Sequence, residues 1–100
     1  MLYVIVAEDV PDSSAKRAAA RDRHYERMTA MQDAGRLLIS GPCPAIDSPD
    51  PGPAGYSGSV IIAEFDSLAA AKAWIAEDPY VTTGVFAKVA VRPFHKGFPR

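Results

Sequence analysis

Four segments of the chain carry runs of β-branched and large apolar residues, which are typical of β-strands. Residues 2–7 are apolar at every position and do not alternate with polar ones, so they indicate a strand that is covered on both faces. Shorter apolar runs at 36–40, 60–65 and 85–91 predict three further strands. The pattern therefore predicts a four-stranded sheet.

The longer of two helical segments lies between the first two strands. It follows polar residues at 12–14 that are suited to N-capping, and it runs to Ala34, where Gly35 provides a typical C-terminal stop. Steps of four, four and three residues place the following side chains on one stripe of this helix: Ala20, His24, Met28 and Met31. His24 is therefore expected to point toward the core.

The shorter helical segment covers residues 68–75, after the N-cap candidates Asp66 and Ser67, and is expected to end at 78–79. Between the second and third strands, residues 42–53 contain five prolines among Asp, Ser and Gly. Because proline cannot donate a ladder hydrogen bond, we expect this stretch to end the second strand and to form an exposed loop. The predicted order is β-α-β-β-α-β.

That order is typical of the ferredoxin-like α+β fold, a four-stranded antiparallel sheet with two helices on one face. The helices cover only one face, yet the first strand is apolar on both. The helix-free face is therefore expected to pack against a second copy of the chain and form a homodimer. We expect one domain over residues 1–98 and a short tail at 99–100, because 100 residues are too few for two packed cores.

Charge and composition argue against several partners and compartments. Eleven basic and twelve acidic residues give a net charge of −1, which leaves no excess positive charge for nucleic acid or an anionic membrane. No apolar run approaches the roughly 18 residues that span a bilayer, and no basic segment precedes the first apolar block as in a secretory signal. We therefore expect a cytoplasmic protein. Cys43 has no basic neighbour, so no catalytic, disulfide or metal role is expected for it.

The order and spacing of several short motifs resemble those of the YciI-like, or YCII-related, proteins over residues 1 to about 98. No single motif is specific, but together they span nearly the whole chain. The motifs are RDRH at 21–24, LL at 37–38 followed by GP at 41–42, AID at 45–47, GS at 58–59, DPYV at 78–81, GV at 84–85 and RPF at 92–94.

This resemblance implies a dimeric α/β barrel, in which two ferredoxin-like protomers press their sheets together. It also implies that the helix-one histidine and the aspartate after the second helix form a paired active site; the matching residues here are His24 and Asp78. Relatives include a dehydrochlorinase of a chlorinated hydroxyhydroquinone, and muconolactone isomerase shares the wider fold. The implied activity is proton transfer on a small cyclic or aromatic compound without a cofactor. The residues themselves argue against a metal, since the chain has two histidines, one cysteine and no HExxH motif.

Each half of this pair also has a purely structural interpretation. A neutral imidazole accepts a proton near pH 7, and a carboxylate on its other nitrogen stabilises the imidazolium, as a general base requires. On an apolar helical face, however, His24 is equally explained as a hydrogen-bonded core residue. Asp78 precedes Pro79 and is equally explained as a turn or helix-end residue that bonds nearby backbone.

Further residues near the pair are candidates for substrate binding. Tyr80 has a hydroxyl for a polar ligand, or it is a packing residue. Arg17 and Arg21 lie on successive helical turns before His24 and reach an anionic ligand, or they form a solvated face. Two alternative substrate-binding candidates, which equally suit turns at strand ends, are Ser40 and Ser59.

Two functions therefore remain open from the sequence. In the first, the protein is a cofactor-independent lyase or isomerase in which His24, oriented by Asp78, moves a proton. In the second, it is a non-catalytic domain that binds a small ligand. His95, beside Lys96 in a basic tail, is expected to be exposed and to take no part in either.

Overall fold

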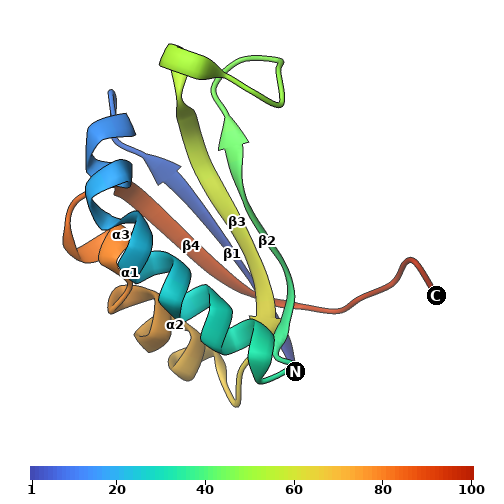
Figure 1. Ribbon diagram of the computed structural model, residues 1–100. Helices are drawn as coiled ribbons and strands as arrows, with labels where there is room; N and C mark the ends of the chain where they lie inside the picture. The colour runs from blue at the N-terminus through green and yellow to red at the C-terminus, as the bar shows by residue number, and fades with distance from the viewer.

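A curved antiparallel sheet forms the centre of the fold (Figure 1). The computed structural model describes residues 1–100. The elements in chain order are β1 (Leu2–Asp9), α1 (Ser14–Asp33), β2 (Leu37–Pro44), a 3₁₀ turn η1 (Gly52–Ala54), β3 (Tyr56–Glu64), α2 (Leu68–Ala76), α3 (Pro79–Thr82) and β4 (Phe86–Phe94). The strands lie in the order β2-β3-β1-β4, and every neighbouring pair is antiparallel. The predicted ferredoxin-like fold is confirmed.

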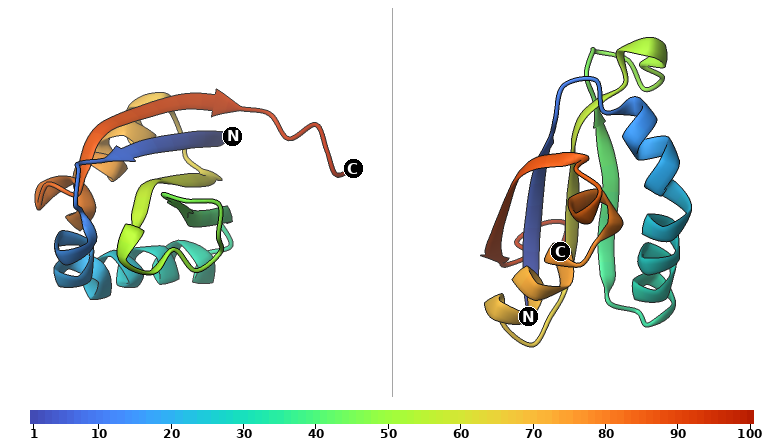
Figure 2. Two further views of the ribbon diagram at one scale, coloured as in Figure 1. Left: turned by 90° about the horizontal axis from the view of Figure 1, so that it is seen from above. Right: turned by 90° about the vertical axis from the view of Figure 1, so that its left-hand side faces the viewer.

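All three α-helices lie on one side of the sheet, which curves around α1 (Figure 2). The side chains of Tyr3, Ile5 and Ala7 on β1 face the helices and are at most 5% exposed. The intervening Val6 faces the other side and is 46% exposed. This alternation follows the two-residue period of a strand, so an apolar run without polar interruptions places apolar side chains on both faces.

The second strand is longer than the sequence predicted. We expected it to end at Ser40, but β2 continues to Pro44, which pairs with Tyr56 of β3. Since β2 is an edge strand, Pro42 and Pro44 do not interrupt a ladder on both sides, which is the position where a sheet tolerates proline. The third strand correspondingly begins at Tyr56, earlier than expected.

The prediction that the Asp78–Pro79 step ends a helix is incomplete, because the same step begins the short helix α3. Proline occupies the first turn of α3, where its missing N–H costs nothing, and the Asp78 side chain accepts from the backbone N–H of Tyr80 as an N-cap. The N-cap position predicted for α1 within residues 12–14 is occupied by Ser13, but the expected side-chain capping bond is absent. The Ser13 hydroxyl donates to Asp9 instead.

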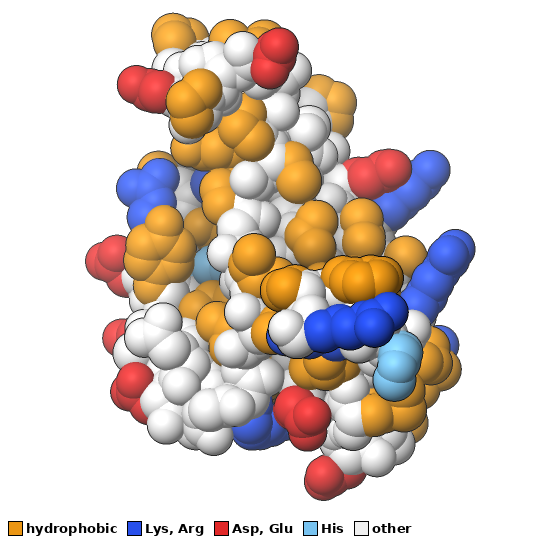
Figure 3. All heavy atoms as spheres, turned by 90° about the vertical axis from the view of Figure 1, so that its right-hand side faces the viewer, with side chains coloured by type: hydrophobic (Ala, Val, Ile, Leu, Met, Phe, Trp, Pro, Cys, Tyr) orange, Lys and Arg blue, Asp and Glu red, His pale blue; other side chains and the backbone are white.

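The helix-free face of the sheet is apolar at its centre. Val4 and Val6 of β1 pair with Ile62 and Val60 of β3, so all four side chains share this face. Ile39 on the edge strand is 60% exposed beside them. Figure 3, drawn from the β2 side, shows hydrophobic side chains across the middle of the molecule. None of the helices has both the length and the apolarity needed to cross a membrane.

Candidate active site

His24 and Asp78 are in direct contact, although 54 residues separate them in the sequence. His24 projects from the middle of α1 and is 6% exposed, while Asp78, between α2 and α3, is fully buried. Nδ1 of the imidazole lies 2.9 Å from Oδ1 and 3.1 Å from Oδ2 of the carboxylate. Because the carboxylate accepts, Nδ1–H donates, and the lone pair of the neutral ring is then on Nε2.

Two further donors hold the Asp78 carboxylate. Nη1 of Arg27 donates to Oδ2 over 3.0 Å, and the backbone N–H of Tyr80 donates to Oδ1 over 2.9 Å. Arg27 is itself fixed by a 2.7 Å bond to the carbonyl of Trp74 and by the Trp74 ring, whose centroid lies 4.4 Å from its Cζ. This set of donors suits an ionised carboxylate and holds the imidazole in one orientation.

Tyr80 covers one face of the His24 ring. The two ring centroids are 4.0 Å apart and the planes differ by 13°, a stacked arrangement. The Tyr80 hydroxyl makes no hydrogen bond within the chain. Every side-chain nitrogen or oxygen that is fully buried does have a hydrogen-bond partner, so this unpaired hydroxyl must be partly accessible to solvent. Burial raises the pKa of the Tyr80 phenol above 10.0, and the nearby Arg17 only partly opposes this. The hydroxyl is therefore protonated at neutral pH and free to donate to a ligand.

We expect absorbance titration of the folded protein to show one tyrosinate step above pH 10 that is absent from the Tyr80→Phe variant. Because the folded state holds this proton more tightly than the unfolded state, its contribution to stability is present at neutral pH. That contribution is lost as the pH rises beyond about 10. In Tyr80→Phe, the free energy of unfolding should therefore decrease less as the pH rises above about 10. A titration curve identical to that of the wild type would contradict the assignment of the high-pH step to Tyr80.

Arg17 and Asp9 form a second buried ion pair next to Tyr80. Nε and Nη2 of Arg17 donate to the two carboxylate oxygens of Asp9 over 2.6 and 2.9 Å. Nη2 also donates to the carbonyl of Gly58 and to Oγ of Ser59, each over 3.0 Å. Nη1 has no partner in the chain and is not sealed from solvent. Arg17 thus keeps one N–H₂ group available to a ligand.

A cavity of about 240 Å³ opens beside His24, between α1, β2 and β3. Its walls include His24, Tyr80 and Arg17. Nε2 of His24 has no hydrogen-bond partner in the chain. Since no fully buried side-chain nitrogen lacks a partner, Nε2 is accessible, and a ligand in the cavity can reach it. Since a cavity of roughly 150 Å³ accommodates benzene, this one is large enough for a substituted six-membered ring.

Ser40 and Ser59 border the same cavity from β2 and β3. The Ser40 hydroxyl donates to the thioether of Met28 over 3.3 Å, a weak bond that a better acceptor can replace. Ser59 accepts from Arg17 and keeps its own proton free to donate. Binding of a substrate by either serine stays a prediction.

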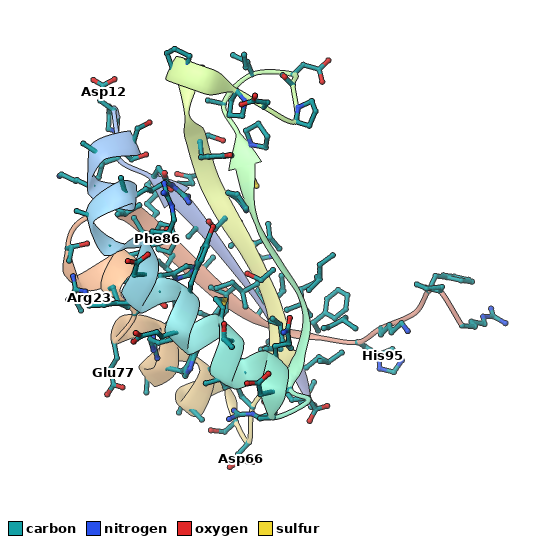
Figure 4. The ribbon with its side chains drawn as sticks, in the orientation of Figure 1. Asp12, Arg23, Asp66, Glu77, Phe86 and His95 are labelled. Carbon is teal, nitrogen blue, oxygen red and sulfur yellow. The ribbon has the colours of Figure 1, made fainter.

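Arg21 borders a different space, an adjoining outer cavity of about 410 Å³. Its neighbour on the same helix, Arg23, points away from the fold in Figure 4, as does Glu77 beside Asp78. The same figure shows His95 on the C-terminal tail, far from α1, and this residue is exposed as expected. The catalytic use of His24 and Asp78, and substrate contact by Arg21 and Tyr80, stay predictions.

Three charged residues of the site were missed or misread in the sequence. Arg17 does not lie on a solvated face but is 6% exposed. Its position one turn before Ala20 continues the buried stripe of α1 and is the signal that indicates its burial. Arg27 follows His24 by one turn on the same helix, whereas nothing in the sequence pairs Asp9 with Arg17. No three His, Cys, Asp or Glu side chains cluster closely enough to hold a metal ion.

The comparison with known families covers almost the whole chain. The model of the YCII-related domain matches residues 1–95. The chain belongs to the YCII-related family. Protein YciI of Escherichia coli is 55% identical over 98 residues, which cover 98% of this chain and 100% of that protein. An uncharacterized protein of Haemophilus influenzae is 51% identical over the same shares of both chains. The resemblance inferred from the YciI-like motifs is confirmed.

A solved structure shares the fold of this YCII-related chain. It is the 5-chloro-2-hydroxyhydroquinone dehydrochlorinase TftG of Burkholderia phenoliruptrix in complex with 2,5-dihydroxybenzoquinone. The TM-score is 0.86, with 97% of this chain and 96% of that chain covered. Sequence identity is 23%, so the likeness establishes a common fold.

Proposed function

We propose that this YCII-related protein is a cofactor-independent lyase or isomerase that moves a proton on a small cyclic or aromatic compound. The observation that carries the proposal is the hydrogen bond of 2.9 Å from His24 Nδ1 to the buried Asp78 carboxylate, with Nε2 left unpaired beside a cavity. A base of this kind needs a free lone pair on one nitrogen and a fixed acceptor on the other.

In the proposed mechanism, Nε2 of His24 removes a proton from a carbon or hydroxyl group of the bound ring. The imidazolium that forms is stabilised by Asp78, whose own charge is balanced by Arg27. The electron pair of a broken C–H bond forms an enolate, whereas that of a broken O–H bond stays on oxygen as a phenolate. In a lyase, a new C=C bond forms as a leaving group such as chloride departs with its bonding pair from an adjacent sp3 ring carbon. A phenolate reaches this state when His24 first returns the proton to the chlorinated carbon, which gives the keto form. An isomerase returns the proton from His24 to another carbon. Neither outcome requires an oxidant or a reductant.

The developing negative charge is placed on an oxygen, and two free donors border the cavity to receive it. These are the Tyr80 hydroxyl and Nη1 of Arg17, neither of which has a partner within the chain. Donors that are fixed before the reaction stabilise such an oxyanion without reorganisation. The buried pair with Asp9 holds Arg17 in place for this role.

The shared fold with a dehydrochlorinase supports its substrate as the first test of a lyase, and muconolactone serves as the test of an isomerase. Purified protein, without added cofactor, is incubated with 5-chloro-2-hydroxyhydroquinone and with muconolactone. Chloride release and product formation are followed by NMR, and binding is followed by calorimetry. We expect turnover of at least one ring compound. Binding of both compounds without turnover, or of neither, would contradict the proposed activity; the first result would favour a ligand-binding domain instead.

We also propose that the helix-free face joins two copies of the chain in a homodimer. Sedimentation equilibrium at micromolar concentration should give twice the 10.7 kDa of one chain. Val6→Lys places a charge at the centre of this face and should yield monomers, because an unpaired charge in an apolar interface costs several kcal/mol. Ile46→Lys is the matched control, since Ile46 is similarly exposed, at 53% against 46%, but follows β2 in the loop. A monomeric wild-type protein would overturn this proposal.

A further inference from the structure

The His24 cavity continues into a second, larger space. The outer cavity of about 410 Å³ lies toward the N-terminal half of α1 and the turn η1. The two cavities share four wall residues: Arg17, Tyr25, Pro42 and Tyr80. A single small molecule can therefore place one end next to His24 and the other in the outer cavity.

The outer cavity is lined by positive and hydroxyl groups. Arg17 and Arg21 contribute guanidinium groups, and Ser14, Tyr25 and Tyr56 contribute hydroxyls. No acidic side chain lines it. The charge of Arg17 is already balanced by its buried pair with Asp9, whereas Arg21 forms neither an ion pair nor a hydrogen bond in the chain. One positive charge is thus left without a counterpart at this end of the site.

The helix sets the distance between this charge and the proposed base. Arg17, Arg21 and His24 follow one another at steps of four and three residues, so they lie along the same side of α1. At 1.5 Å per residue, Arg21 is about 4.5 Å and Arg17 about 10 Å from His24 along the helix axis. A linker of a few atoms is therefore long enough to connect an anionic group in the outer cavity to a ring beside His24.

We propose that the outer cavity binds a carboxylate, and that the substrate is a small ring compound carrying a carboxylate on a short arm. This inference rests on the proposed function for the position of the reacting ring. The carboxylate accepts from Arg21, in the planar geometry that guanidinium groups favour, while Nη1 of Arg17 stays free for the oxyanion of the ring. A carboxylate fits better than a phosphate, since only one charge is uncompensated and three aromatic rings, Tyr25, Tyr56 and Tyr80, border the space.

A pair of probes that differ only in charge tests this inference. Calorimetry compares 2,5-dihydroxyphenylacetate with its neutral amide, on the wild type and on Arg21→Gln. We expect the wild type to bind the carboxylate at least about tenfold more tightly, a difference of about 1.4 kcal/mol. Arg21→Gln should reduce this preference to less than twofold. Arg23→Gln is the matched control, because Arg23 lies on the same helix but points away from the fold.

Several results would overturn the inference. These are equal binding of acid and amide by the wild type, a full carboxylate preference in Arg21→Gln, or stronger competition by inorganic phosphate than by phenylacetate at equal concentration. Because the measurement is of binding, it is separate from the proposed activity. A carboxylate preference that depends on Arg21, without turnover of any ring compound, supports the subsite and contradicts the activity. Turnover that is unaffected by Arg21→Gln, with no carboxylate preference, supports the proposed activity and contradicts the carboxylate subsite.

Discussion

Replacing His24 by glutamine is expected to lower kcat by about 10²- to 10⁴-fold, the range that a general base contributes. The glutamine amide can still donate a hydrogen bond to Asp78 and fills a similar volume, so the cavity should keep its shape. Its amide cannot accept a proton, however, and the base is lost. Binding should remain within a few-fold of the wild type, because the proposed donors to the ring compound, Tyr80 and Arg17, are unchanged.

The measurement is steady-state kinetics on the ring compound that the wild type turns over, together with calorimetric binding of the same compound. His95→Gln is the matched control, since it makes the same change at the other histidine, which is exposed on the C-terminal tail. Its kcat should equal that of the wild type. A His24→Gln protein with wild-type kcat would show that another group removes the proton, even if Asp78 holds His24 as described.

Local patterns were sufficient to predict the fold because each main strand and helix has its hydrophobic periodicity within one short stretch of sequence. The apolar run of β1 and the stripe of α1 show their periodicity within one segment, and those elements are present. The extension of β2 to Pro44 could not be predicted in the same way. Whether proline is tolerated depends on whether the strand lies at the edge of the sheet, which is a property of the strand order.

The candidate site was only partly predictable for the same reason. Helical spacing indicates that His24 faces inward, but its partner lies 54 residues away and was assigned from the family resemblance. The pairing of Arg17 with Asp9 depends on how the end of β1 packs against α1, and this packing cannot be predicted from residue spacing in the sequence. Buried charges require such partners, so an arginine on an apolar stripe is itself a signal that an acidic residue lies nearby.

The donors around Asp78 link stability to the proposed chemistry. His24 and Arg27 come from α1, the Tyr80 N–H begins α3, and Arg27 also binds the end of α2 through Trp74. A single carboxylate and its donors therefore join three helices. The group that orients the proposed base is at the same time part of the core, so changes to it are expected to alter both properties.

Asp78→Ala is accordingly expected to lower the free energy of unfolding by about 3–5 kcal/mol, the usual cost of removing one partner from a buried charge pair. The substitution leaves the His24 Nδ1–H and an Arg27 N–H without their acceptor, and it removes the N-cap of α3. Urea unfolding followed by circular dichroism measures the loss. Glu77→Ala, at the adjacent acidic residue that points away from the fold, should change stability by less than about 0.5 kcal/mol.

Asp78→Asn separates the structural role of this residue from its electrostatic one. The asparagine Oδ1 can still cap α3 and accept from one donor, so most of the stability should return, to within about 1–2 kcal/mol of the wild type. The negative charge that stabilises the His24 imidazolium is absent, so kcat should stay low, near that of His24→Gln. If Asp78→Ala were as stable as the wild type, the carboxylate would not hold the helices together. If Asp78→Asn had full activity, its charge would not support the base.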